Sequence, residues 1–330
     1  WVHDENDWHI PVKKARKAMD EDGTTLMVGK LHAGIAARFS TDRNAFAADL
    51  ERIVATHYAF IIEKGFSVSI NYKEVKPSPT KLVLTKPPVG KKSPVIQPFM
   101  FTTVIDGVSV FLAVGFTRPI PSLDEAAAEQ EETRYSSLGA GWTILCNDRA
   151  VLYCDRTELT GWGEAGVPRY HNQFIAISGI VEFRSDDPGK LPTTTTKRGI
   201  DASSRLFLQI KNKMREGMTI FIDYTNKWKG RAEESRKQID AGQRMNIHEL
   251  KCEAQRMMFR TTNRSVPHGK QFKPNLPMPK TVDLKNRHIS FVRSANDVQA
   301  VAEHLFDDVD KSPSAVGEKC FDLILMEARR

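Results

Sequence analysis

Two apolar segments joined by only two residues constrain the fold of this chain more than any other feature. Residues 99–105 and 108–116 are rich in Phe, Val, Thr and Ile, and Asp106 and Gly107 stand between them. An Asp-Gly pair accepts the left-handed backbone of a two-residue turn, whose twist matches that of antiparallel strands. The pattern therefore predicts a β-hairpin in the middle of the chain.

A second hairpin is predicted further along. Asn147, Asp148 and Arg149 lie between two apolar segments, residues 142–146 and 150–154. Short polar turns between segments of this kind are typical of antiparallel strand pairs. The middle of the chain therefore contains several strands that are neighbours in sequence.

Helical periodicity marks two long segments, and a strand lies between them. Apolar residues recur at helical spacing over 44–64 and again from 201 through about 229, whereas 174–183 is a continuous apolar run typical of a strand. Because strands and helices do not alternate as βαβ units, we predict an α+β fold with a mixed β-sheet. The other predicted elements are a helix at 11–20, strands at 26–31 and 66–72, a polar helix at 233–260, and linkers at 76–98 and 261–285.

Residues 286–330 are predicted to form a separate small βαα module. A strand begins at His288, and helices follow at about 295–306 and 313–328. This order resembles a ribbon-helix-helix DNA-binding unit, in which strands of two chains pair and enter the major groove. His288 and Ser290 would then face the DNA. The alternative is a dimerisation or docking module.

The composition is that of a globular protein without a membrane span or a metal site. The chain has 330 residues, enough for two or three domains, and 27% of them are charged. No apolar run approaches the roughly 20 residues that cross a bilayer. None of the four cysteines forms a Cys-x-x-Cys pair. We therefore expect no metal site, and reduced cysteines in a cytoplasmic protein.

The charge of the chain permits nucleic acid as a partner without requiring it. The net charge is +7 and the isoelectric point is about 9.1. Basic residues cluster at 13–17 and 227–231, and a third cluster lies on the helix predicted after residue 201. That third cluster supplies the candidate nucleic-acid contacts, which are Lys211, Lys213 and Arg215.

A glycine-rich segment at 161–166 matches the dinucleotide pattern GxGxxG by letter only. A dinucleotide fingerprint needs a strand directly before the first glycine and a helix directly after the last. Here Thr157–Thr160 intervene, and Pro168 blocks the start of a helix. The segment is therefore predicted to be a loop, and its His171 to hydrogen-bond the fold.

The loop from Leu191 to Asp201 carries the most informative polar residues. It reads Leu-Pro-Thr-Thr-Thr-Thr-Lys-Arg-Gly-Ile-Asp, with Lys197 near its centre. Lysine offers a compact charge on a long stem, so Lys197 can reach and neutralise a transferred γ-phosphoryl group. Asp201 is the predicted N-cap of the next helix. The alternative is an ordinary solvated loop.

Several of these segments occur in the order found in GHKL-type ATPases. Gly23-Thr24-Thr25-Leu-Met-Val resembles the strand that closes the ATP-binding domain of DNA gyrase B, MutL, MORC proteins and heat-shock chaperones. Residues 60–71 resemble the helix–strand entry to the transducer domain that follows. Cys146-Asn147-Asp148-Arg149 resembles the Asn-x-Arg hairpin of MutL-like transducers. In that family a lysine on a later loop contacts the γ-phosphate, and Lys197 matches it by position.

The resemblance implies a division of the chain into four parts. Residues 1–30 would be the tail of an ATP-binding domain, and residues 31–230 a transducer with a ribosomal-protein-like mixed sheet. Residues 231–285 would form a helical extension and linker, and residues 286–330 the βαα module. The implied function is an ATP-dependent conformational switch that closes a homodimer and acts on a nucleic-acid or protein client.

ATP and magnesium are implied as ligands of a longer parent protein. The family's ExxxNxxDA helix and DxGxG loop, which hold magnesium and adenine, are absent from this sequence. Because no initiator Met precedes Trp1, the ATP-binding domain is expected upstream. The implied nucleotide contacts, with Lys197 as the catalytic residue, are Gly23, Thr24, Thr196, Lys197 and Arg198.

Two functions from other classes stay open from the sequence. One is a stand-alone nucleic-acid-binding module that uses the Lys211–Arg215 segment and the ribbon-helix-helix-like C-terminus. The other is a non-catalytic scaffold. Only the ATPase hypothesis requires magnesium- and adenine-binding motifs upstream of this chain.

Overall fold

The computed structural model describes residues 23–41, 43–88, 93–122, 125–126, 139–196, 199–262, 266, 269–279 and 289–329. The chain divides into two compact units, Trp1–Met278 and Pro279–Arg330. The first unit combines helices with a seven-stranded sheet that contains both antiparallel and parallel pairs. The predicted α+β class with a mixed sheet is therefore confirmed.

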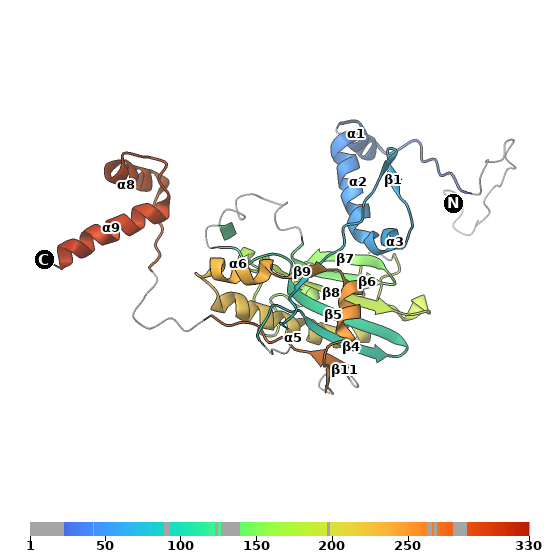
Figure 1. Cartoon of the computed structure of the whole chain (residues 1–330). Coiled ribbons are helices and arrows are strands. Elements are labelled where there is room, and N and C mark those ends of the chain that lie inside the picture. Colours follow the sequence, from blue (N-terminus) through green and yellow to red (C-terminus); the bar gives the residue numbers. More distant parts are fainter. Residues whose placement is uncertain are drawn as a thin grey trace. The chain divides into compact units, whose positions relative to one another are not determined.

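One large sheet organises the first unit (Figure 1). Its strands are β4 (Phe99–Ile105), β5 (Val108–Phe116), β6 (Gly141–Cys146), β7 (Arg149–Asp155), β8 (Ile177–Arg184), β10 (Arg260–Thr262) and β11 (Gly269–Phe272). The strand order is β10-β11-β4-β5-β8-β6-β7, and β6 runs parallel to β8. Both predicted hairpins, β4–β5 and β6–β7, are confirmed. Asp106 and Gly107 have positive φ, as the two-residue turn requires.

Both faces of this sheet are apolar and buried, as strand β5 illustrates. Val110, Leu112 and Val114 belong to one hydrophobic core. Phe111 and Ala113 belong to a second. Successive side chains of a strand point to opposite faces, so each of the two cores lies on its own side of the sheet. Each apolar face therefore needs its own cover.

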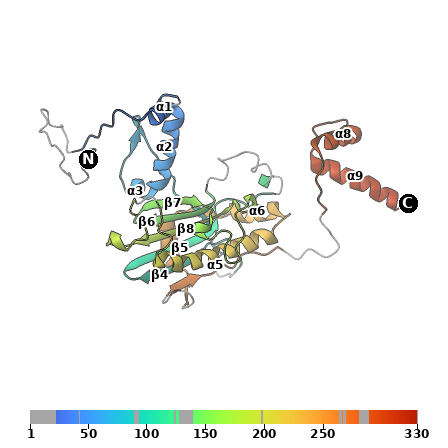
Figure 2. The same ribbon diagram turned by 180° about the vertical axis from the view of Figure 1, so that it is seen from behind.

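Helix α5 (Arg205–Lys227) covers the first face, as the view from behind shows (Figure 2). The helix predicted from about residue 201 to 229 is confirmed, but its start is corrected. Ser204 occupies the N-cap, while Asp201 accepts hydrogen bonds from the backbone N–H and the hydroxyl of Ser203 in the preceding turn. The buried apolar side chains of α5 recur every three or four residues: Phe207, Ile210, Met214, Met218 and Phe221.

The second face is covered by helix α7 (Ile247–Ala254) and by the strand pair β3 (Leu82–Leu84) and β9 (Gln243–Met245). The single polar helix predicted over 233–260 is corrected, because α6 (Ala232–Asp240) ends before β9 begins. The partner of β9 lies far upstream in sequence, so local periodicity does not reveal it.

Strands β10 and β11 lie in the segment that was predicted to be a linker. Strand β11 pairs with β4 and β10 pairs with β11, so both extend the large sheet. Residues 231–278, expected as part of a separate extension, therefore belong to the first unit. None of the helices among the described residues is long and apolar enough to pass through a bilayer.

The N-terminal described segment departs from the predicted strands. The helix predicted over 44–64 is confirmed as two consecutive helices, but residues 26–31 form no strand, and Leu26 and Met27 are 87% and 93% exposed. No neighbouring strand pairs with them among the described residues. The predicted helix at 11–20 lies outside the described residues. The elements of this segment are α1 (Ala33–Thr41), α2 (Arg43–His57), α3 (Ala59–Glu63), β1 (Ser69–Ile70) and β2 (Lys73–Glu74).

Helices α8 (Ala295–Phe306) and α9 (Pro313–Ala328) form the second unit, and both match their predicted positions. The predicted strand is corrected, because the described residues 289–293 pair with no strand. His288 lies outside the described residues. Between residues 289 and 329 the sequence has eight acidic and four basic side chains. Over the whole unit, Pro279–Arg330, the sequence has nine acidic and eight basic side chains, so the unit is close to neutral.

A substitution of Gly179 tests how closely the central strands pack. A β-carbon at this position of β8 would lie 2.3 Å from the ring of Trp142, which is 1% exposed and pairs with Gly179 from β6. We expect Gly179→Ala to lower the free energy of unfolding by about 1–3 kcal/mol, because the enclosed ring has no room to move. Urea denaturation followed by circular dichroism measures this change.

The matched control is Gly34→Ala in helix α1, where an added β-carbon meets no atom within 4 Å. This control should leave stability unchanged or raise it slightly, because alanine favours helix. Equal stabilities of the two variants would contradict the packing described for Gly179.

Candidate functional site

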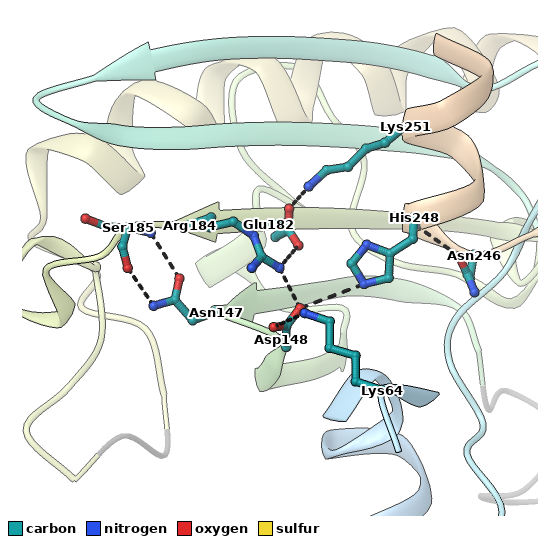
Figure 3. A network of polar contacts seen from close by, with 9 residues as sticks. All are labelled: Lys64, Asn147, Asp148, Glu182, Arg184, Ser185, Asn246, His248 and Lys251. Atoms are coloured by element: carbon teal, nitrogen blue, oxygen red, sulfur yellow. Dashed lines mark hydrogen bonds and ion pairs between the residues drawn. The ribbon is translucent and has the colours of Figure 1, made fainter. Parts of the chain in front are cut away.

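The turn between β6 and β7 holds the chain where it leaves β8. The Asn147 side chain accepts a hydrogen bond from the Ser185 N–H at 3.0 Å and donates one to the Ser185 carbonyl at 2.7 Å. Figure 3 shows this two-point contact. Asn147 and Asp148 both adopt positive φ, which Asn and Asp tolerate better than most residues. The Asn-Asp turn therefore fixes the start of the loop that leads to helix α5.

Asp148 joins three separate elements through its carboxylate (Figure 3). Lys64, just after α3, and Arg184, at the end of β8, each donate to it at 2.5 Å. The His248 Nε2 atom of α7 lies 3.8 Å away. The Asp148 side chain is only 14% exposed, so these pairs are screened less than surface pairs.

Glu182 places a second carboxylate inside the apolar face covered by α7. The side chain is 1% exposed and lies on β8, on the same face as Ile180. Arg184 donates to Glu182 at 3.0 Å, and Lys251 of α7 forms a further ion pair with it. A buried carboxylate is tolerated only when it is paired and hydrogen-bonded. Arg184 therefore links Glu182 to Asp148 in one continuous network.

Burial and neighbouring charges shift several pKa values in this network. Burial raises the pKa of Asp148, but hydrogen bonds from Lys64 and Arg184 outweigh it and hold that pKa below its ordinary value. Burial lowers the pKa of His248, and Lys64 and Arg184 add to this effect while Asp148 opposes it. Burial also lowers the pKa of Lys251. At neutral pH, Asp148 is therefore ionised and His248 is neutral.

Asp148, Glu182 and His248 also have the donor types of a metal site. One ligand atom from each lies within 4.8 Å of the others. However, Lys64, Arg184 and Lys251 already neutralise the two carboxylates. A divalent cation would have to displace these ammonium and guanidinium groups. The arrangement is therefore an ion-pair network and does not have the features of a metal site.

The loop that follows Ser185 closes on itself like a small hairpin. Thr193 and Ile200 form an isolated antiparallel bridge, and the Thr194 N–H donates to the Gly199 carbonyl at 3.1 Å. Pro192 and Ile200 are buried, which anchors both sides of the loop in the first unit. The tip between Thr194 and Gly199 is held at both ends.

The nucleotide contacts expected from the sequence fall in two places. Thr196 is exposed at the loop tip, and Lys197 and Arg198 follow it but lie outside the described residues. Gly23 and Thr24 are exposed at the start of the described segment. No hydrogen bond or ion pair joins Gly23 or Thr24 to the described part of the loop.

The structure gives an ion-pair partner to each of the three basic residues of α5 that were predicted to contact nucleic acid. Lys211 and Arg215 both pair with Glu164, at 2.7 and 2.9 Å. Lys213 is only 2% exposed and pairs with Glu216 at 2.8 Å. The glycine-rich loop that carries Glu164 lies against α5, so Lys211 and Arg215 share one carboxylate. Of the other predicted nucleic-acid contacts, Ser290 is exposed in the second unit and His288 lies outside the described residues.

Sequence reasoning missed the charged base of this loop. Glu182 lies in the run 174–183, which was interpreted only as an apolar strand, although a carboxylate in such a run is itself a signal of a buried ion pair. The signal for α7 was Asn246 followed by Glu249, which form a capping box in the structure. No local pattern points from Lys64 to Asp148.

No protein-family model matches this sequence, and no curated protein matches it. The role of the loop therefore has to be inferred from its own geometry, from the charges at its base, and from the GHKL-like order of motifs along the chain.

Removal of the Asn147 side chain should loosen the loop. Asn147→Ala deletes both hydrogen bonds to Ser185 and leaves the partly buried peptide groups without partners, so we expect a loss of about 1–3 kcal/mol of stability. Amide hydrogen exchange over residues 185–201 should quicken more than exchange in β4 and β5. Asn226→Ala, exposed on α5, is the control and should change neither measurement. Unchanged exchange in the loop of Asn147→Ala would contradict the anchoring role.

Acidification should destabilise the protein partly through His248. Because burial lowers the pKa of folded His248 below 6.5, the unfolded chain binds a proton there more readily. The stability that depends on neutral His248 is fully present above pH 6.5. It falls as the pH drops through the lowered pKa of the folded protein. We expect His248→Gln to remove part of the loss in unfolding free energy between about pH 7.5 and pH 5.5.

Urea denaturation at both pH values measures this difference. His304→Gln, exposed on α8, serves as the control and should retain the pH dependence of the unmodified protein. A dependence that is unchanged in His248→Gln would show that this imidazole does not contribute.

Proposed function

We propose that this chain is the transducer portion of a GHKL-type ATPase, which couples ATP binding and hydrolysis to conformational change and dimer closure. In this proposal an ATP-binding domain lies N-terminal to the chain, and the loop after β8 senses the nucleotide. The observation that carries the proposal is the two-point contact of Asn147 with Ser185, which anchors the lysine-bearing loop to the Asn-Asp-Arg turn.

The chemistry proposed for Lys197 is electrostatic. Its ammonium group would approach the γ-phosphate of ATP held by the neighbouring domain and offset the negative charge that develops during phosphoryl transfer. The hydrogen bond between the Thr194 N–H and the Gly199 carbonyl supports this role, because it brings together the two residues on either side of the tip. Thr196 and Arg198 flank Lys197 and would make weaker contacts with the phosphates.

The charged network supplies a route from the loop to the rest of the unit. A shift of the loop would pull on Ser185 and Arg184, and Arg184 pairs with Asp148 and Glu182. Asp148 also holds Lys64 at the end of α3, so movement would pass to the N-terminal helices. Coupling between sites requires such packed and hydrogen-bonded elements with more than one arrangement.

The exposed N-terminal segment is consistent with a missing partner domain. Leu26, Met27 and Val28 are 79–93% exposed, and Ile35 and Phe39 of α1 are more than 40% exposed. Contiguous apolar surface of this kind marks an interaction site. We propose that the ATP-binding domain covers it, with Gly23 and Thr24 leading out of that domain. ATP and magnesium would be held there, because this chain has neither the ExxxNxxDA helix nor the DxGxG loop.

The observations do not favour the nucleic-acid alternative. The side chains of Lys211, Lys213 and Arg215 all take part in ion pairs within the first unit, and the second unit has nearly equal numbers of acidic and basic side chains. A phosphate backbone is bound through uncompensated positive charge. We propose a protein as the client of the switch, and the homodimer is part of the same proposal.

The role of Lys197 can be tested in a protein that joins this chain to its ATP-binding domain. We expect Lys197→Ala to reduce ATP turnover about 100-fold or more, as loss of a charge-stabilising donor does in other active sites. The affinity for ATP should fall much less, since most contacts lie in the other domain. Arg198→Ala, one residue away, is the matched control and should have the smaller effect. A turnover rate unchanged by Lys197→Ala would end the proposal for this loop.

Calorimetry on the chain of residues 1–330 completes this test. With magnesium and a non-hydrolysable ATP analogue, we expect no binding in the micromolar range, because the adenine- and magnesium-binding motifs are absent. Micromolar binding by this chain alone would contradict the proposal that ATP is held by the other domain.

A further inference from the structure

The segment from Arg156 to Tyr170 surrounds a pocket that the proposed function does not use. The pocket has a volume of about 560 Å³. The residues that line it combine two arginines with apolar and aromatic groups: Arg156, Thr157, Glu158, Leu159, Trp162, Arg169 and Tyr170. Its volume is within the range of ligand sites, and most of the residues that line it are polar or charged.

The floor of the pocket is held in place before any ligand arrives. The Asp155 carboxylate accepts hydrogen bonds from the hydroxyls of Thr157 and Thr160, at 2.9 and 2.7 Å. On the far side of the same loop, Glu164 pairs with Lys211 and Arg215 of α5. The loop is therefore tied to β7 at its start and to α5 in its middle.

Arg156 brings a positive charge to this pocket without a carboxylate partner. Its guanidinium carbon lies 4.8 Å from the centre of the Tyr170 ring, and the residue is half-buried. No described acidic side chain forms an ion pair with it. Stacking on an aromatic face orients a guanidinium and leaves its N–H edge free to bind an oxyanion with two hydrogen bonds.

Trp162 supplies a donor that lacks an acceptor. The residue is 1% exposed and lines the pocket, and its indole Nε1 has no hydrogen-bond partner among the described residues. By contrast, the buried Trp228 donates its indole N–H to the Pro277 carbonyl at 3.2 Å. Buried donors without acceptors are rare in folded proteins, and each one needs an explanation.

We propose that this pocket binds a carboxylate side chain of an acidic peptide segment in a partner protein. Arg156 would bind the carboxylate. The Trp162 N–H, which is enclosed in the present arrangement, would donate to an oxygen of the same segment after a shift of the ring or of the loop. Arg169 lies 3.8 Å from Glu158, so these two charges offset each other and Arg156 leaves one net positive charge. One net positive charge matches a carboxylate better than a doubly charged phosphate, which Glu158 would repel more strongly than it repels a carboxylate. Leu159 and the aromatic rings provide apolar contact for the residues beside the carboxylate.

A labelled peptide tests this proposal on the whole chain. The probe is a fluorescein-labelled, C-terminally amidated octapeptide in which leucine and glutamate alternate, and polarisation reports its binding. We expect Arg156→Gln to weaken binding about tenfold or more, and Trp162→Phe, which removes only the N–H, to weaken it severalfold. Arg293→Gln, at another arginine–aromatic contact in the second unit, should bind as the unmodified protein does.

Spectroscopy of the indole groups separates a direct contact from a change in folding. In protein labelled with ¹⁵N at tryptophan, the Trp162 N–H resonance, assigned by its loss in Trp162→Phe, should shift downfield with the probe while that of Trp228 stays in place. Thermal unfolding verifies that both pocket variants are folded. Absence of binding at millimolar peptide, or equal binding of a peptide with glutamine in place of glutamate, overturns the proposal. Tighter binding of a phosphoserine peptide also overturns it, because the site would then select phosphate.

Discussion

The central sheet buries apolar side chains on both faces, and the arrangement of the first unit depends on this burial. Burial of apolar surface contributes roughly 25 cal/mol per Å², so a strand such as β5 is stable only when both of its sides are covered. Helix α5 provides one cover, and α7 with the β3–β9 pair provides the other. These covers come from segments far from β5 in the sequence. The sheet therefore brings together segments of the first unit that are distant in sequence.

Two charged residues, Glu182 and Arg184, lie at one end of β8 beside these apolar cores. Glu182 lies on the face covered by α7, and its desolvation would cost several kcal/mol without positive partners. Lys251 of α7 and Arg184 of the same strand form ion pairs with Glu182. Helix α7 is therefore positioned by an ion pair as well as by apolar contacts. Arg184 continues to Asp148, which also binds Lys64. The base of the loop is thus joined to both the N-terminal helices and α7.

The same physical logic accounts for the basic residues on α5. Lys211 and Arg215 looked exposed from helical spacing alone, because spacing places side chains on a helix face but does not show what covers that face. Glu164 comes from a loop whose glycines allow it to lie against the helix, and its single carboxylate pairs with both side chains. A cluster that suggested a nucleic-acid surface therefore stabilises the loop that forms the pocket beside Trp162.

The sequence by itself determined the elements whose signals are local. The Asp106-Gly107 turn, the apolar run that became β8, the long helix α5 and the two C-terminal helices follow from turn chemistry and periodicity over short windows. The strands β9, β10 and β11 escaped prediction because each is only three or four residues long, and β9 and β11 pair with the distant strands β3 and β4. The ion pairs Lys64–Asp148 and Lys251–Glu182 join residues 84 and 69 positions apart. Only the tertiary structure decided them, because a buried charge selects its partner by distance in space, and folding of the sheet sets that distance.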